Sequence, residues 1–305
     1  MSRAEAWRAR LARVTAPLEP WLPALRVARF ALAVALVVAM GVLAVRDVPS
    51  RDVTWSLMAP AVAIAVAWWV LLARIWAILV SGRPTAADVG TWCRTQVLRY
   101  IPGGIWAPTS RVAVVRGSAV DRVATVAAEN LVALCAALAI AGVALTASGR
   151  PAWAPLLLTA LVPHALLRLL GERSRLEDRR VARALAEGLA GFVAYAACAV
   201  LVQAAVSGWH DELRVAGAAA LAWGAGLVVV FAPGGVGIRE VAYVGLLASS
   251  FPHRDLVAAA VVMRAVTIAA ELLVLVVAGR PPAVAESKSS RRFAAFDDAN
   301  DPSES

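Results

Sequence analysis

The chain has 305 residues, 61% of them hydrophobic, and its mean hydropathy is positive at +0.72. Several apolar runs exceed the roughly 18 residues that mark a membrane-spanning helix, which the core of a soluble protein of this size does not need. The formal net charge of +9 comes almost entirely from arginines at the ends of apolar runs and in particular loops, which indicates membrane orientation and contact with anionic lipid headgroups rather than nucleic-acid binding.

The N-terminal segment 1–24 is basic and contains Trp7 and Trp21, a composition typical of an interfacial helix. The apolar run after it, 25–45, is longer than the ~7–15 residue core of a signal peptide, and no clear small-residue cleavage site ends it. We therefore expect an uncleaved first span.

The predicted fold is an all-α, polytopic membrane helix bundle of about seven or eight spans. The transmembrane domain covers 25–280, and the tail 281–305, rich in Ser, Asp, Asn and Arg, is predicted to be disordered and cytoplasmic. Pro60 predicts a kink, and Ser118-x-x-Asp121 matches a capping box at a helix start. The predicted spans are 25–45, 54–80, 119–146, 152–170, 189–207, 213–232 and 256–278, with a further apolar stretch at 236–250.

Arginine counts predict the orientation. The N-terminal region and the loops 81–118 and 171–188 carry six, five and five arginines, whereas the other connections carry one or two each. If these three arginine-rich segments lie in the cytoplasm, the chain is a multi-pass protein of the cell membrane with eight crossings and both termini inside. Both helix breaks described below then begin on the cytoplasmic side. The stretch 236–250 is shorter than the ~20 residues of a straight span, and if it re-enters instead, the count drops and the tail changes side.

The loop 81–118 contains a helix signal of its own. Thr85-x-x-Asp88 is a cap, and an apolar and aromatic face follows, with Arg94 and Arg99 turned away from it. This pattern predicts a helix that lies on, or dips into, the inner leaflet. The face consists of Val89, Trp92, Cys93, Gln96, Val97 and Tyr100.

Two nearly identical stretches interrupt the apolar pattern, namely Tyr100-Ile101-Pro102-Gly103-Gly104-Ile105 and Phe231-Ala232-Pro233-Gly234-Gly235-Val236. Proline removes a backbone donor and glycine permits turns that other residues resist, so each triplet breaks a helix. At membrane depth such a break requires cover by protein or a water-filled cavity. Paired breaks in two halves point to the binding site of a transporter and are compatible with an inverted repeat.

Ionisable residues deep inside predicted spans are usually functional. Glu129 lies roughly 16 Å past Ser118, and Arg264 roughly 14 Å past Asp255, at 1.5 Å per residue. Glu271 shares one helix face with Arg264. Two interpretations stay open: Glu129 and Arg264 form a structural ion pair, or they line a polar pathway and alternate between each other and a lipid headgroup.

Arginines surround both breaks. Arg111 and Arg239 each follow a break that opens onto a helix start, where exposed amides and a guanidinium together suit a phosphate. Arg99 is a further candidate, and Arg116 fits the positive-inside bias. The tryptophans Trp92 and Trp106 are more typical of interface anchors. Small-residue runs, Gly217–Ala220 and Gly224–Gly226, favour close helix packing over a ligand loop.

Motifs of common enzymes are absent from the sequence. It has no Walker motif, no GxGxxG after a strand and no HExxH, and its three cysteines lie far apart without a CxxC pair. We therefore expect no cofactor, no metal and no enzymatic activity.

The two Pro-Gly-Gly motifs, with Glu129 between them and Arg264 after them, resemble the transmembrane region of lysylphosphatidylglycerol synthases, the flippase-like integral membrane family. The resemblance covers roughly residues 25–280. It implies a bundle that moves lipid headgroups between leaflets. In bifunctional relatives this region is fused to an aminoacyltransferase domain; the chain ends at Ser305 without one, so we do not expect synthase activity. The family's glutamate is often followed by arginine, whereas Asn130 follows Glu129 here, so the charge of the headgroup is not carried over.

Three functions remain in competition. The first is a lipid translocase for an aminoacyl or anionic phospholipid or a polyprenyl-phosphate-linked sugar. The second is a non-catalytic subunit that holds a partner glycosyltransferase or lipid-modifying enzyme at the inner leaflet, and the third is a transferase with Glu129 or Glu240 as base. For the translocase, the predicted headgroup site comprises Arg99, Tyr100, Pro102, Gly103, Gly104, Trp106, Arg111, Glu129, Pro233, Gly234, Gly235, Gly237, Arg239, Glu240, Arg264 and Glu271.

Overall fold

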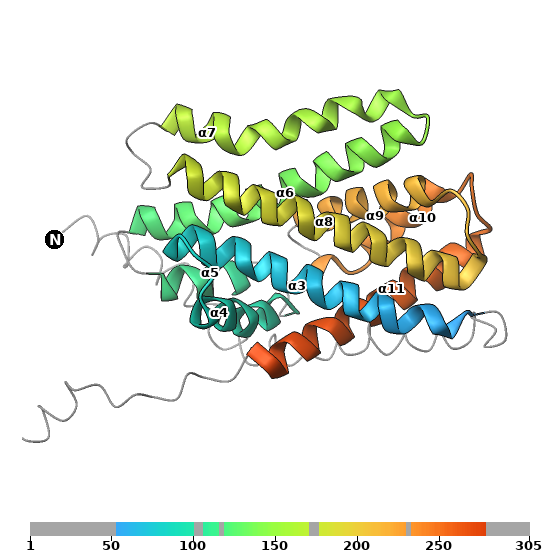
Figure 1. The fold of residues 1–305 in the computed structure, drawn as a ribbon, viewed down its shortest axis with the longest axis horizontal. Coiled ribbons are helices and arrows are strands. Elements are labelled where there is room, and N and C mark those ends of the chain that lie inside the picture. Colours follow the sequence, from blue (N-terminus) through green and yellow to red (C-terminus); the bar gives the residue numbers. More distant parts are fainter. Residues whose placement is uncertain (1–52, 101–105, 116–118, 171–176, 230–232, 279–305) are drawn as a thin grey trace, which may run out of the picture.

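The computed structural model describes residues 53–100, 106–115, 119–170, 177–229 and 233–278 (Figure 1). Every regular element in these ranges is helical. The predicted interfacial segment, the first span and the tail lie outside the described residues, as do Ser118 and the first Pro-Gly-Gly triplet.

Thirteen helical elements make up the described part of the chain. Four helices are long and apolar enough to cross a membrane, and they cover Trp55–Ser81, Val120–Ala147, Asp178–Ser207 and His253–Val277. The all-helical bundle is therefore confirmed, and its four long apolar helices are compatible with a membrane protein, whereas the count of seven or eight spans stays a prediction. In chain order the elements are η2 (Trp55–Leu57), α3 (Met58–Ser81), α4 (Ala86–Gln96), η3 (Val97–Tyr100), α5 (Trp106–Val114), α6 (Ala119–Ala147), η4 (Pro151–Leu161), α7 (Val162–Leu170), α8 (Asp178–Ser207), α9 (Glu212–Val228), η6 (Pro233–Gly235), α10 (Ile238–Leu247) and α11 (His253–Ala278).

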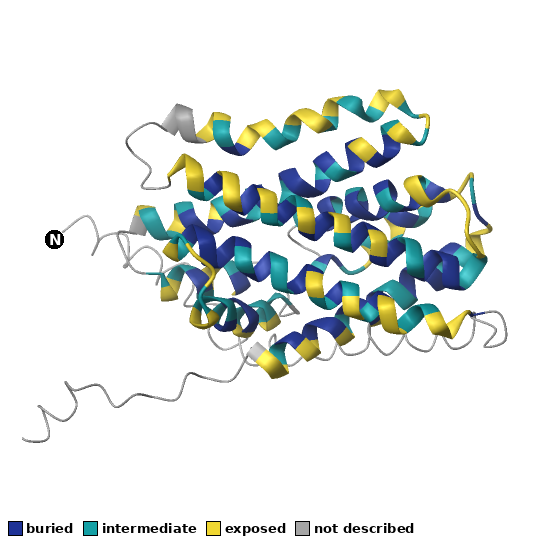
Figure 2. Cartoon of the chain, in the orientation of Figure 1, coloured by how far each residue is buried: buried dark blue, intermediate teal, exposed yellow. Residues whose placement is uncertain are grey.

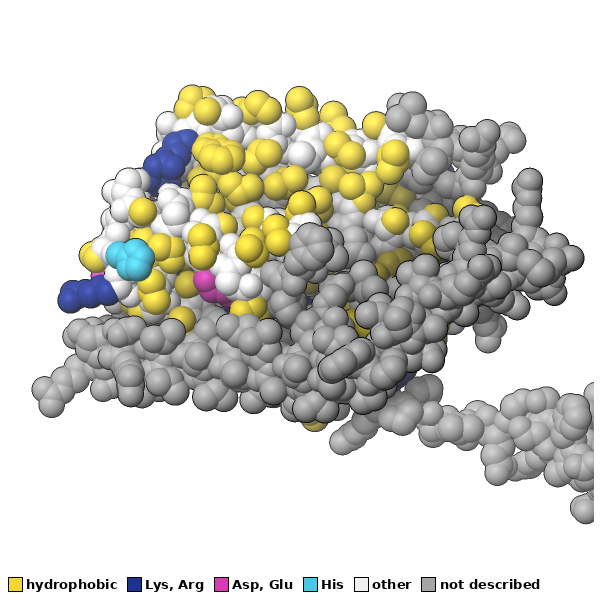
Figure 3. Space-filling model, turned by 180° about the vertical axis from the view of Figure 1, so that it is seen from behind, with side chains coloured by type: hydrophobic (Ala, Val, Ile, Leu, Met, Phe, Trp, Pro, Cys, Tyr) yellow, Lys and Arg dark blue, Asp and Glu magenta, His cyan; other side chains and the backbone are white. Residues whose placement is uncertain are grey.

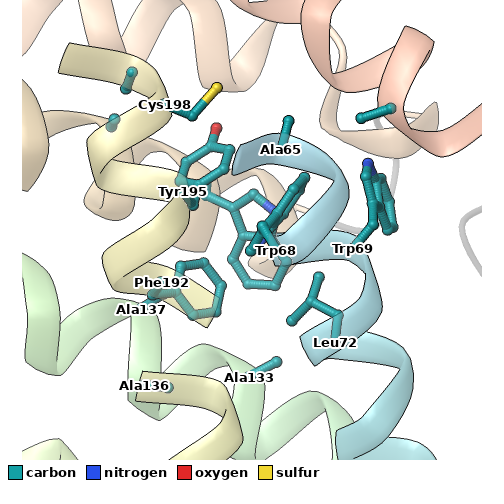
Figure 4. Close-up of a cluster of buried hydrophobic side chains, with 14 of the residues drawn as sticks. Ala65, Trp68, Trp69, Leu72, Ala133, Ala136, Ala137, Phe192, Tyr195 and Cys198 are labelled. Atoms are coloured by element: carbon teal, nitrogen blue, oxygen red, sulfur yellow. The ribbon is translucent and has the colours of Figure 1, made fainter. Parts of the chain in front are cut away.

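The centre of the bundle is the contact between α3 and α8, and α6, α9 and α11 pack around them. Buried aromatic rings fill this contact (Figure 4). The ring of Trp68 lies 4.6 Å from those of Trp69 and Tyr195, and Phe192 packs at the same distance against Trp223 of α9. The buried faces of α3 and α8 are turned toward the inside of the bundle (Figure 2).

Much of the described outer surface is apolar, as expected of helices in lipid. Large exposed hydrophobic side chains include Val143, Leu158, Leu161 and Val193. In the view of Figure 3, hydrophobic side chains cover most of the surface that is described, and arginine and histidine side chains gather at one end.

Glycines allow the long helices to approach closely. A Cβ on Gly217 of α9 would lie 2.6 Å from a side-chain carbon of Leu145 in α6, and one on Gly188 of α8 would lie 3.0 Å from Ala136. The predicted close packing at the Gly217–Ala220 run is therefore confirmed.

Three local predictions need correction. Helix α8 begins at Asp178 rather than near 189, so most of the predicted loop 171–188 is helical. Val181, Ala184 and Gly188 repeat at helical spacing and are buried. Pro60 does not kink α3, because it is the third residue of that helix, where its missing N–H would have no intrahelical partner. The predicted span 152–170 is a 3-10 helix followed by α7, with Pro155 inside the 3-10 part.

The elements around the two breaks form two antiparallel hairpins. In the first, α4 packs against α5, and the hairpin joins the end of α3 to the start of α6. In the second, α9 packs against α10, and Arg214 near the start of α9 donates to Ser249, just beyond the end of α10. This second hairpin therefore leaves the end of α8 and returns to the start of α11 at the same end of the bundle (Figure 1).

The two hairpins approach each other inside the bundle, where η3 of the first contacts η6 of the second. The second break lies beside Arg264, eleven residues or ~16 Å into α11, so it is far from either end of that helix. The prediction that the second break begins at the cytoplasmic face does not match this position, whereas the first break lies outside the described residues. The hairpins open at opposite ends, the first beside the end of α3 and the second beside the end of α8.

Candidate functional site

A cavity of about 440 Å³ lies where the hairpins meet the long helices. Its wall combines charged, aromatic and glycine residues from α4, α5, α6, α9 and the second break. The lining includes Trp92, Gln96, Arg99, Arg111, Glu129, Asn130, Trp223, Gly226, Gly234, Gly235 and Arg239.

Glu129 and Arg111 form a buried ion pair on the cavity wall, in which Arg111 Nη1 donates to Glu129 Oε1. Trp92 Nε1 donates to the same oxygen at 2.6 Å, and Arg111 Nη2 donates to Gln96 Oε1 at 2.8 Å. Both charged side chains are buried, yet Glu129 Oε2 has no hydrogen-bond partner in the part of the chain that the structure describes. The pair therefore leaves one carboxylate oxygen available on a wall of the cavity.

The predicted pairing of Glu129 with Arg264 is wrong. Arg264 donates from both terminal nitrogens to the carbonyl of Gly234 at 3.3 Å, and its Nη1 lies 4.0 Å from Glu240 Oε1. Its guanidinium thus holds the backbone of the second break. The sequence could not show this exchange of partners, because it depends on α5 folding back between α4 and α6.

Arg99 also differs from its prediction, since it faces inward and not away. Its Nη2 donates to Glu271 Oε2 at 2.6 Å, and its guanidinium carbon lies 4.5 Å from the ring centre of Trp69. The cause is the change to a 3-10 helix at Val97, where each residue turns by 120° instead of 100°. Arg94, one turn earlier in α4, is exposed as predicted.

Arg239 runs through a slot between two glycines. A Cβ on Gly226 would lie 2.4 Å from Arg239 Cγ, and one on Gly235 would lie 2.7 Å from its Nε, so neither position has room for a larger residue. The guanidinium carbon lies 5.2 Å from the ring centre of Trp223. Arg239 makes no hydrogen bond or ion pair with any residue that the structure describes, and its Nε is buried. The Arg239 guanidinium therefore lines the cavity with an aromatic ring nearby and without a paired carboxylate among the described residues.

The glycines of the second break are required by its backbone. Gly234, Gly235 and Gly237 have φ of 59°, 71° and 84°, in the region that favours glycine. Glu240 caps the helix that follows, because its Oε2 accepts from the Gly237 amide at 2.6 Å. The predicted anion site at this helix start is thus filled in part by the chain's own carboxylate.

The remaining predicted residues play smaller parts. Trp106 begins α5 and is 40% exposed, whereas Trp92 is 3% exposed and donates to Glu129, so the prediction of Trp92 as an interface anchor is wrong. Tyr100 ends η3, and Pro233 begins η6. Sequence reasoning missed Gln96 as the second partner of Arg111, and it assigned Gly226 to helix packing, where it accommodates Arg239.

No metal cluster of three or more His, Cys, Asp or Glu residues occurs in the described ranges. Cys93, Cys135 and Cys198 are all buried free thiols. A scan against protein-family models finds no match for the chain, and a search of curated proteins finds no similar sequence.

Proposed function

We propose that this protein is a lipid translocase that moves a phosphate-containing lipid between membrane leaflets. The observation that carries the proposal is the guanidinium of Arg239, which makes no hydrogen bond or ion pair within the described residues, on the wall of a cavity of about 440 Å³ inside a membrane helix bundle. A charge taken out of water is costly unless an opposite charge meets it. An anionic group in the cavity would supply that charge.

The other arginines around the cavity each have a carboxylate beside them, so the positive charge of Arg239 is in excess. Arg111 is neutralised by Glu129 and Arg99 by Glu271, while Arg264 lies next to Glu240. One extra positive charge fits a phosphodiester, which carries one negative charge, and the planar guanidinium can donate to two phosphate oxygens. Both an anionic phospholipid and a polyprenyl-phosphate-linked sugar contain such a phosphate.

The two hairpins supply a route. If they re-enter the membrane from opposite faces and meet at the cavity, each closes one end of a path, and rocking one hairpin at a time gives alternating access. The spans predicted at 213–232 and 236–250 then form one re-entrant hairpin. The crossing count falls by two, so the tail keeps its predicted cytoplasmic side.

The ion pairs between hairpins and long helices are suited to such motion. Arg99 and Arg111 belong to the first hairpin, whereas their partners Glu271 and Glu129 belong to α11 and α6. A phosphate that enters the cavity competes with these carboxylates for guanidinium groups. Whether these arginines pair with the carboxylates would then depend on whether a headgroup is in the cavity. Headgroup binding would thus be coupled to the position of the first hairpin.

Leaflet exchange in liposomes tests the proposal. Fluorescent phosphatidylglycerol and a short polyprenyl-phosphate sugar are compared side by side with wild-type protein and with Arg264→Ala. Arg254→Ala is the matched control, because that arginine is 82% exposed at the start of the same helix. We expect exchange of at least one lipid, its loss in Arg264→Ala and wild-type exchange in the control. Folded wild-type protein that exchanges neither lipid would favour the partner-holding role.

A further inference from the structure

A second basic cleft lies outside the central cavity, where α3 ends and α8 begins. It has a volume of about 490 Å³ and is lined by three arginines, one glutamate and small or apolar residues. We propose that this cleft binds the phosphate headgroup of an anionic phospholipid of the surrounding leaflet, at a site separate from the translocation cavity. The lining is Arg74, Ile78, Gly82, Arg83, Pro84, Arg183, Ala186, Glu187 and Ala190.

The charges of the cleft favour an anion. Arg74 is already paired, since its Nε and Nη2 donate to the two oxygens of Glu187 at 3.0 and 2.6 Å. Arg83 and Arg183 are exposed and make no hydrogen bond or ion pair through their side chains within the described ranges. The cleft therefore carries two uncompensated positive charges, one from each side, which can both donate to a single phosphate.

The position of the cleft favours a lipid. Arg74 lies seven residues or ~10 Å before the end of α3, whereas Arg83 lies just beyond that end. The cleft therefore runs from the level of a headgroup down along the bundle. Its wall also includes the apolar side chains of Ile78, Ala186 and Ala190, which suit the start of an acyl chain. The combination of basic and apolar side chains fits a phospholipid better than a free anion.

An occupant of this cleft would touch the joint of the first hairpin. Gly82 ends α3 with φ of 75°, and Ser81 Oγ donates to Asp88 Oδ2 in α4 at 2.6 Å. Arg83 and Pro84 form the link between these two helices. A bound headgroup would thus restrain the joint from which α4 extends to Trp92 and the cavity.

Binding is tested with purified full-length protein and phosphatidylglycerol, by counting the lipids retained in native mass spectrometry. We expect the double variant Arg83→Gln/Arg183→Gln to bind at least tenfold more weakly than wild type. Arg179→Gln/Arg254→Gln removes two other exposed arginines as the matched control and should bind like wild type. Glu187→Gln should bind more tightly, because it releases the Arg74 guanidinium to the cleft.

Three results would overturn the proposal. They are equal retention in the double variant and wild type, equal retention of phosphatidylcholine, and binding of inorganic phosphate as tightly as phosphatidylglycerol. Arg239→Ala separates this site from the translocation cavity, since it should keep the lipid in the cleft even where leaflet exchange is lost. Loss of the retained lipid in Arg239→Ala would place the binding in the central cavity instead.

Discussion

Gly226→Ala tests whether the position of Arg239, and not only its charge, is required for lipid movement. The added methyl group would lie 2.4 Å from Arg239 Cγ and 2.6 Å from its Nε. Nonbonded carbon atoms settle at about 3.5–4.0 Å, so the arginine must move by about 1 Å or more. The substitution leaves every charge in place, yet it moves the guanidinium away from Trp223 and the cavity wall.

The magnitude follows from the bond that is lost. A hydrogen bond to a charged group contributes ~1.5–3 kcal/mol, which corresponds to a decrease of roughly 10- to 150-fold in the rate of leaflet exchange if the bond forms during translocation. Crowding in the slot should also lower the free energy of unfolding by ~1–3 kcal/mol. The assay is exchange of fluorescent phosphatidylglycerol in liposomes, with thermal unfolding in detergent to show that the variant is folded.

Gly245→Ala is the matched control, because a Cβ at that position of α10 meets nothing within 4 Å. It should keep the wild-type rate and gain roughly 0.5–1 kcal/mol in stability as a helical Gly-to-Ala change. A folded Gly226→Ala protein with the wild-type rate would refute the role given to the position of Arg239.

Further substitutions test the partners seen in the site. Arg111→Met and Glu129→Gln should each lower stability by ~3–5 kcal/mol, whereas Arg111→Met/Glu129→Leu should recover most of it, because each single change leaves a buried group unpaired; equal losses in single and double variants would contradict the pair. A double-mutant cycle between Glu129 and Arg264 should give a coupling within about 0.5 kcal/mol, and a larger value would restore the pairing expected from the sequence. Trp92→Phe removes the donor to Glu129 and should cost ~1.5–3 kcal/mol in thermal unfolding, so an unchanged transition would exclude that hydrogen bond. Cys93, Cys135 and Cys198 should react with a maleimide only after denaturation, because all three thiols are buried; rapid labelling of the folded protein would contradict that burial.

The bundle could be predicted from the sequence because its signals are local. Apolar length located α3, α6 and α11 to within four residues at each end, and Thr85 caps α4 as its spacing predicted. The repeated Pro-Gly-Gly motif likewise indicated two helix breaks, of which the second is described.

The pairing of charges could not be predicted in the same way. Depth along a helix placed Glu129 and Arg264 at comparable levels, but depth does not show which neighbour stands beside a side chain. Only the folded hairpins place Arg111 next to Glu129 and the Gly234 carbonyl next to Arg264. The local change from α to 3-10 geometry at Val97 likewise turned Arg99 toward the inner face of the helix, by roughly 60° over three residues.

The most direct test of the central claim is the initial rate of leaflet exchange in wild-type, Arg239→Ala and Arg254→Ala proteoliposomes, with protein amount and folding matched. If the protein is a translocase in which Arg239 contacts the phosphate, lipid exchange should be rapid in wild type and in Arg254→Ala. In Arg239→Ala the exchange rate should be near that of protein-free liposomes. Equal rates in all three proteins, or no exchange by folded wild-type protein, would contradict the account.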